Sequence, residues 1–274
     1  MLAEIGEDEA TGEIAAIFAE VRELWGVPYV SAIQRHLATR PGVLEWAWEA
    51  VAPAFRSGAA QMAGERAAAG VNLPPLPAIP RDALGVWGVD THGLATIRAI
   101  ADGFVRVAPT NMMFAGLVKA LLAGAAPGGA TSPASGRWAK PAPLPAPPAM
   151  LAPEKLDAAT RGTLMQFATP SDGKPFVPGL YRMLAHWPGY LAHLATVLPP
   201  RLTEPATVAA FDQIRSRIDA AVPEVLATLP RDATARPMPV ASEREHFLTI
   251  GGTYRKTSPE LIVLGRLISD ALPR

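Results

Sequence analysis

The chain has 274 residues, of which 49% are hydrophobic and 18% are charged. This length fits one large domain or two of ordinary size, and the composition supports a packed core and excludes a disordered chain. The formal net charge is zero, from 25 basic and 25 acidic residues. Because no net charge attracts nucleic acid or an anionic membrane, we predict that neither is a partner.

The chain contains no cysteine. Disulfides, thiol nucleophiles, CxxC redox chemistry and thiolate metal sites are therefore excluded. Residues 1–10 are acidic and lack the apolar core of a signal peptide, and the most apolar stretch, residues 112–126, is interrupted by Lys119. We expect a soluble, cytoplasmic protein.

Helical periodicity dominates the chain. Ile14, Ile17, Phe18 and Val21 follow the spacing that places apolar side chains on one helix face. Helices are predicted at residues 11–24, 31–39, 42–68, 91–104, 111–124, 154–168, 178–186, 189–198, 204–229, 241–255 and 259–272. No segment shows the convincing alternation of a strand, so the predicted fold class is all-α.

A short motif occurs twice, with 147 residues between matched positions. The first copy, residues 25–30, reads WGVPYV, and the second, residues 172–177, reads DGKPFV. Ten residues after each copy comes a Pro-Gly pair, Pro41-Gly42 and Pro188-Gly189. The repeat predicts an internal duplication that forms two pseudo-equivalent helical lobes about an approximate two-fold axis.

The two copies are separated by a segment with eight prolines between Pro127 and Pro153. Such a composition disfavours helix and sheet and favours extended polyproline conformation. We therefore divide the chain into a first helical repeat (1–124), a Pro/Ala/Gly-rich linker (125–153) and a second helical repeat (154–274). A cleft between the two lobes is the expected ligand site.

At the first position of the motif, Asp172 replaces Trp25. Pro170-Ser171-Asp172-Gly173 has the composition of a turn, in which an aspartate or serine caps backbone N–H groups. The functional alternative is a general base, because a carboxylate in an apolar cleft can take a proton from water. The internal repeat favours this alternative, since the first copy builds the equivalent segment without an aspartate.

Other candidate site residues each have an ordinary structural alternative. Asn111 lies at a predicted helix start, where it either caps the helix or orients a water or a substrate oxygen. Ser171 either caps the turn or donates to a ligand. Trp25, Tyr29 and Tyr254 are either core residues or walls of a pocket.

The five histidines, at positions 36, 92, 186, 193 and 246, show no metal-binding motif such as HExxH. No phosphate-binding loop and no serine nucleophile motif occur either. We predict no metal and no cofactor.

The segment 171–178, SDGKPFVP, together with residues 25–30 and Asn111, resembles the group I 2-haloacid dehalogenases, the type that accepts both the D and L enantiomers. The resemblance spans nearly the whole chain, including the duplication and the Tyr254 region. It implies an all-helical enzyme with two repeated lobes, an active site between them, a homodimeric assembly and no cofactor. The same helical scaffold is similar to that of alkylhydroperoxidase D, whose cysteine chemistry this chain lacks.

The resemblance further implies hydrolysis of short 2-haloalkanoic acids to 2-hydroxy acids, with inversion at C2. Asp172 matches the catalytic aspartate that activates a water, and Asn111 matches an amide that holds this water. Ser171, Trp25 and Tyr254 match substrate-binding positions. Two alternatives stay open: a non-catalytic protein that binds a small acid on this scaffold, and a hydrolase or decarboxylase that acts on another small acid.

Overall fold

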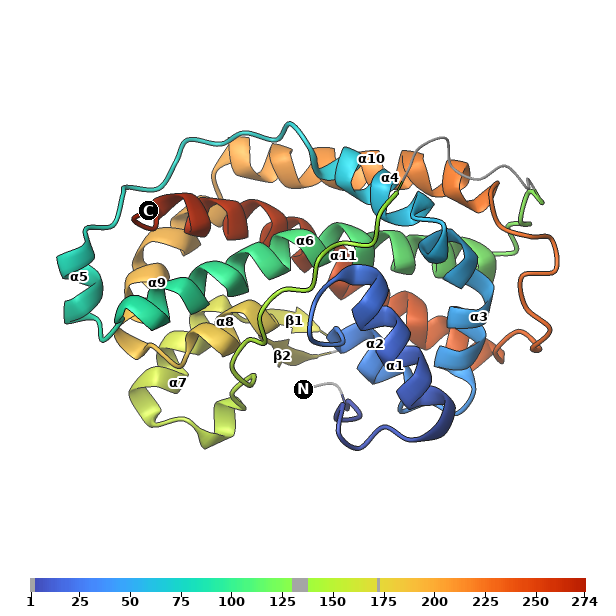
Figure 1. The fold of residues 1–274 in the computed structure, drawn as a ribbon, viewed down its shortest axis with the longest axis horizontal. Helices are drawn as coiled ribbons and strands as arrows, with labels where there is room; N and C mark the ends of the chain where they lie inside the picture. Colours follow the sequence, from blue (N-terminus) through green and yellow to red (C-terminus); the bar gives the residue numbers. More distant parts are fainter. Residues whose placement is uncertain (1–2, 130–137, 172) are drawn as a thin grey trace.

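The fold of the chain, taken from a computed structural model, is helical around one central pair of long helices (Figure 1). The structure describes residues 3–129, 138–171 and 173–274. Its α-helices are α1 (Gly12–Trp25), α2 (Ala32–Leu37), α3 (Val43–Arg56), α4 (Ala59–Ala68), α5 (Arg81–Val86), α6 (Thr91–Leu122), α7 (Ala158–Leu164), α8 (Gly179–Leu184), α9 (Pro188–Leu202), α10 (Pro205–Leu226) and α11 (Ala241–Ala271). Two short 3-10 helices, Pro153–Lys155 and Met165–Phe167, flank α7. The predicted all-α class is confirmed.

Each of the two longest helices contains a proline that the sequence analysis took for a boundary. The predicted helices 91–104 and 111–124 are one helix, α6, which runs through Pro109. The predicted helices 241–255 and 259–272 are likewise one helix, α11, which runs through Pro259. Both prolines are buried, and α6 and α11 pack against each other. Tertiary packing therefore outweighs the loss of one backbone hydrogen bond per proline.

The predicted helix 42–68 is instead divided into α3 and α4 at Ser57 and Gly58. Gly58 has a φ of 78°, a left-handed conformation that ends the first helix at low cost only for glycine. The ring of Trp138, in the linker, lies directly against Gly58, where an added Cβ would be 2.1 Å from its Cγ. The break thus also makes room for the linker.

A two-stranded antiparallel hairpin, which the sequence analysis did not predict, interrupts the helices. Strand β1 (Thr169–Ser171) pairs with β2 (Lys174–Phe176), and Ser171 stands opposite Lys174. Three residues per strand are too few to show alternation, which explains the miss. Lys256 of α11 donates from Nζ to Thr169 Oγ1 at 2.8 Å and holds the hairpin against the central helices.

The linker crosses the molecule in front of α6 (Figure 1). In its described part, residues 138–153, Leu144 N donates to Gly26 O at 3.2 Å, and Arg106 Nη1 donates to Ala142 O at 2.7 Å. An extended chain cannot satisfy its own backbone groups, so these contacts with the helices fix its path.

Two short helices are separated by the same 147 residues as the two copies of the sequence motif. Helix α2 begins at Ala32 and α8 at Gly179, and they end at Leu37 and Leu184, so both bounds differ by 147 residues. The duplication itself and the three-part division of the chain stay predictions.

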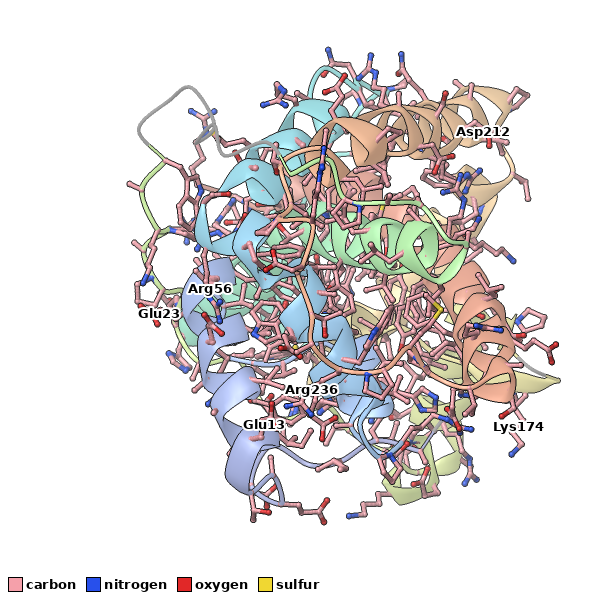
Figure 2. All side chains as sticks on the ribbon, turned by 90° about the vertical axis from the view of Figure 1, so that its right-hand side faces the viewer. Glu13, Glu23, Arg56, Lys174, Asp212 and Arg236 are labelled. Carbon is pink, nitrogen blue, oxygen red and sulfur yellow. The ribbon has the colours of Figure 1, made fainter. Side chains whose placement is uncertain are left out.

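Charged side chains lie at the periphery (Figure 2). Lys174 and Asp212 point outward, and Arg236 lies beside Glu13. Arg236 also pairs with Glu49 of α3, with 3.0 Å between Nε and Oε2, so it ties the segment before α11 to the first helices. Within the described ranges, no helix is both long and apolar enough to cross a membrane.

The contact between Gly58 and the linker predicts a graded loss of stability. Gly58→Ala should lower the free energy of unfolding by about 2–5 kcal/mol, from left-handed strain plus overlap with Trp138. Gly42→Ala is the matched control, because Gly42 also has a positive φ of 76° but an added Cβ would meet nothing within 4 Å. It should cost only about 1–2 kcal/mol. Equal losses in urea unfolding would contradict the proposed linker contact.

Candidate functional site

A small cavity, here called the inner cavity, lies where α6, α8 and α11 meet the end of β2 and the segment before α2. Its volume is about 50 Å³, room for roughly three or four waters. Residues from both halves of the chain line it: Tyr29, Ser31, Ala32, Phe104, Val107, Ala108, Asn111, Met150, Phe176, Val177, Pro178, Gly179, Arg182, Tyr254, Thr257, Ser258 and Leu261. The cavity therefore brings together Tyr29, Asn111 and Tyr254 from the predicted set.

Asn111 is held in a polar network at the wall of this cavity. Its Nδ2 donates to Ser31 Oγ at 2.8 Å, and its Oδ1 accepts from Gln34 Nε2 at 3.4 Å. Gln34 is fully buried. Asn111 lies inside α6, two residues after Pro109, so the predicted helix start is wrong. The network leaves the amide with one N–H and one lone pair for a ligand.

Two tyrosines present buried hydroxyl groups at the same cavity. Neither the Tyr29 nor the Tyr254 hydroxyl has a hydrogen-bond partner among the described residues. Burial raises the pKa of both hydroxyls far above the ordinary value of about 10, so both stay neutral donors. Phe104 packs on Tyr29 and Phe176 on Tyr254, with ring centroids 5.8 and 5.7 Å apart.

Asp172 and the side chain of Ser171 lie outside the described residues. The chain joins β1 to β2 through positions 172 and 173, and the second strand leads directly into the cavity wall at Phe176. Gly173, with a φ of 69°, and Lys174 are exposed. The catalytic role of Asp172 stays a prediction.

Trp25 does not line the inner cavity. It is the last residue of α1, is 2% exposed and packs against Phe55 and Phe114, with ring centroids 6.0 and 6.4 Å apart. Because the indole turns toward α3 and α6, it lies in the hydrophobic core, which was the structural alternative for this residue.

The sequence analysis did not single out Arg182, Ser31, Gln34 or Thr257. Arg182 lines both the inner cavity and a wider surface depression, here called the outer hollow, of about 590 Å³. A signal for it was present, because Arg35 and Arg182 are 147 residues apart, as matched motif positions are. Ser31 and Gln34 gave no such signal, since Pro178 and Tyr181 stand at their matched positions.

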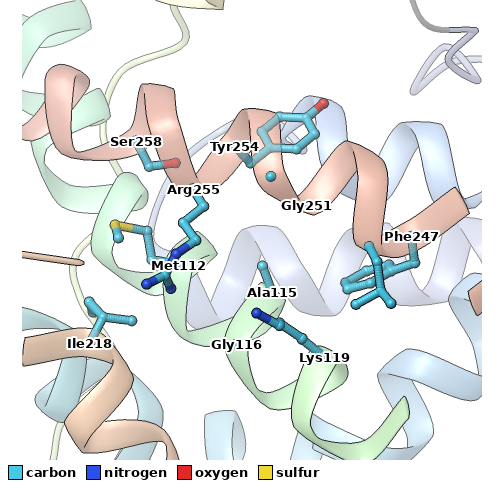
Figure 3. A pocket seen from close by; sticks show the side chains of 12 residues that line it. Met112, Ala115, Gly116, Lys119, Ile218, Phe247, Gly251, Tyr254, Arg255 and Ser258 are labelled. Carbon is cyan, nitrogen blue, oxygen red and sulfur yellow. The ribbon is translucent and has the colours of Figure 1, made fainter. Parts of the chain in front are cut away.

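A second cavity, here called the apolar cavity, adjoins the inner cavity across Tyr254 and Ser258, which line both. Its volume is about 300 Å³, and Figure 3 shows Met112, Ala115 and Phe247 in its wall with Lys119 nearby. The Tyr254 ring points away from Lys119 in this view. Of the predicted residues whose side chains the structure describes, Tyr254 alone lines the apolar cavity.

In the described part of the chain, no three histidine, aspartate or glutamate side chains lie close enough together to hold a metal ion. The ring nitrogens of buried His36 and half-buried His246, both Nε2, hydrogen-bond to each other at 2.7 Å. His36 Nδ1 also contacts Ala3 O at 2.6 Å. This pair lies outside the lining of the inner cavity.

Comparison with known sequences relates the chain to one kind of enzyme. It is 27% identical over 232 residues to an (R)-2-haloacid dehalogenase of Pseudomonas putida. The aligned region covers 80% of this chain and 74% of that protein. No family model matches the chain.

Solved structures share the fold of this chain. A D-2-haloacid dehalogenase mutant in complex with D-2-CPA superposes with a TM-score of 0.76 at 22% identity, covering 99% of this chain and 96% of that one. A D-2-haloacid dehalogenase in complex with L-LA also gives 0.76 at 22% identity, covering 99% and 97%. The chain thus has the helical fold of D-2-haloacid dehalogenases, and the sequence similarity supports its relation to 2-haloacid dehalogenases.

The buried hydroxyls predict a specific response to alkali. All four tyrosines of the chain, at positions 29, 181, 190 and 254, have pKa values raised by burial. Since the folded state disfavours tyrosinate, stability is complete below the unfolded pKa of about 10 and falls above it, by about 1.4 kcal/mol per pH unit for each tyrosine.

We therefore expect tyrosinate absorbance to appear together with unfolding, as seen by circular dichroism. The chain unfolded in urea, which serves as the control, should titrate near pH 10. Smooth ionisation of the native protein at that pH, with its helices intact, would show that the hydroxyls are accessible.

Proposed function

We propose that this protein hydrolyses short 2-haloalkanoic acids to 2-hydroxy acids, with release of halide. The observation that carries the proposal is the inner cavity, which Asn111 lines together with the end of the motif of the resemblance, Phe176 to Pro178. The similarity to an (R)-2-haloacid dehalogenase supports the same chemistry.

In the proposed reaction, a water attacks C2 from the side opposite the halogen. The Asp172 carboxylate accepts one proton of this water and Asn111 Oδ1 accepts a hydrogen bond from the other, so an oxygen lone pair is directed at C2. The new C–O bond forms as the C–halogen bond breaks, the halide leaves with the bonding pair, and C2 is inverted. Asp172 then returns its proton to solvent.

The network around Asn111 supports its part in this reaction. Gln34 donates to Asn111 Oδ1, which fixes that oxygen as the acceptor side of the amide, and Ser31 holds the Nδ2 side. An amide that is already oriented requires no rearrangement when the water binds.

The wall of the cavity excludes bulk water and limits the size of the substrate. Tyr29, Phe104, Phe176 and Tyr254 surround the space, and the two hydroxyls are neutral donors suited to a departing halide. The small volume of the inner cavity, about 50 Å³, favours short acids over long ones. We propose that Ser171 hydrogen-bonds the substrate and that Trp25 supports the wall from the core.

Following the resemblance, we further propose that the enzyme acts on both enantiomers, needs no cofactor, works in the cytoplasm and forms a homodimer of duplicated chains. Its mass in solution by light scattering tests the dimer. Halide release from chloroacetate and from both enantiomers of 2-chloropropionate tests the activity and the stereochemical claim.

Asp172→Asn should lower kcat by about 10²- to 10⁴-fold, since it removes the general base. Asp232→Asn is the matched control, because Asp232 is an exposed aspartate in another turn, and its activity should equal that of the wild type. A single turnover in heavy-oxygen water should leave the Asp172 carboxylate unlabelled. Label in that carboxylate would show an ester intermediate and exclude direct attack by water.

Asn111→Ala should lower kcat by about 10- to 100-fold, because the water loses the acceptor that orients it. Thr110→Ala is the neighbouring control, since Thr110 is buried in α6 but does not line the cavity. Steady-state kinetics of halide release with both variants, after thermal denaturation has established that they fold, measures the effect. An unchanged kcat in Asn111→Ala would remove this residue from the mechanism.

A further inference from the structure

Arg182 of α8 occupies the passage between the outer hollow and the inner cavity, because it lines both. Its side chain is half-buried and fixed at one edge, where Nε donates to Leu151 O at 3.0 Å. The backbone completes the contact, since Leu151 N donates to Arg182 O at 3.3 Å. The linker thus holds the guanidinium group in one orientation.

The two terminal nitrogens of the Arg182 guanidinium group have no partner among the residues that the structure describes. Nη1 and Nη2 of Arg182 make no hydrogen bond and no ion pair to any described residue, and Nε makes only the bond to Leu151. Burial lowers the pKa of Arg182, and the charges of Glu4 and Glu154 act on it without an ion pair. A partly buried cation without a counterion is costly, so an entering anion gains the missing interaction.

Arg35, which lies 147 residues before Arg182 in the sequence, has a different electrostatic environment. Arg35 forms an ion pair with Glu4, and it lines the outer hollow but not the inner cavity. The charge of Arg35 is therefore already compensated, whereas that of Arg182 is available to a ligand.

Two other cations near the cavities already have partners, whereas Lys119 lines only the apolar cavity. Lys256 donates to Thr169, and Arg255 is paired with both carboxylate oxygens of Asp219 beside the apolar cavity. Among the described residues that line the inner cavity, Arg182 alone carries a positive charge.

We propose that Arg182 binds the carboxylate of a small monocarboxylic acid at this passage and so directs C2 into the inner cavity. This inference rests on the proposed function for the reaction at C2, but not for the binding of the acid. The planar fork of Nη1 and Nη2 matches the two oxygens of a carboxylate, which a point charge does not. Arg182 is thus a specificity-determining residue that selects acids over their neutral analogues.

The test measures binding of propionate and L-lactate, which carry no halogen, by titration calorimetry. Arg182→Gln should weaken both by about 10- to 100-fold, the loss expected for charge-assisted hydrogen bonds. Propionamide, which is neutral, should bind wild type and variant equally. Arg182→Lys should recover part of the affinity, because it keeps the charge but not the fork.

Arg106→Gln is the matched control. Arg106 is also half-buried and also clamps the linker, through Gly26 O at 2.9 Å and Ala142 O at 2.7 Å, but it lines neither the inner cavity nor the outer hollow. If Arg106→Gln weakens propionate binding as much as Arg182→Gln does, loosening of the linker explains both and the inference is overturned.

The inference and the proposed function fail in different ways. Turnover of haloacids with equal KM and equal propionate affinity in wild type and Arg182→Gln overturns the role of Arg182 alone. Propionate binding that depends on Arg182, without halide release from any haloacid, supports the carboxylate site and rejects the dehalogenase. Circular dichroism shows whether Arg182→Gln folds. If it does not fold, Arg182→Lys provides the test. An unchanged propionate affinity and an unchanged KM in Arg182→Lys would contradict binding of the carboxylate by the guanidinium fork.

Discussion

The close packing of α6 against α11 is the constraint on which the site depends. At Gly265, an added Cβ would lie 2.8 Å from Val105 Cγ2 and 3.2 Å from Ala101 O, so the two backbones approach as closely as they do only because this position has no side chain. Both helices continue past their buried prolines without interruption, and this packing stabilises them there. It thereby sets Asn111 on α6 opposite Tyr254 on α11 across a space of about 50 Å³. A wider separation would open this space to bulk water.

The inner cavity combines an oriented amide, two neutral hydroxyls and one cation in a largely apolar wall. Two of these groups are held by hydrogen bonds: Asn111 by Ser31 and Gln34, and Arg182 by the linker. Because most of the lining is apolar, electrostatic interactions with a ligand are stronger there than at the surface. The proline-rich linker is therefore part of the site, since it also packs against Gly58 and hydrogen-bonds Gly26.

Matched motif positions differ in chemistry and, in part, in backbone, since Trp25 ends α1 whereas Lys174–Phe176 forms β2. Tyr29 and Phe176, 147 residues apart, both line the inner cavity. Arg35 pairs with Glu4 in the outer hollow, whereas its match Arg182 reaches the inner cavity. Trp25 is part of the core. If the chain arose by duplication, the copies diverged at some positions: Arg35 pairs with Glu4 while Arg182 borders the inner cavity, and Trp25 is buried in the core where the second copy has an acid.

The sequence by itself determined the all-α class and most helices, because helical periodicity is a local signal. The linker and the roles of Asn111, Tyr29 and Tyr254 stay predictions from the sequence. Only the tertiary structure decided that α6 and α11 continue through proline, that Asn111 stands within a helix, that Trp25 is buried in the core and that Arg182 borders the cavity. These outcomes depend on contacts between segments far apart in the chain. Local propensity does not contain such contacts, and packing overrides it wherever enough apolar surface is buried.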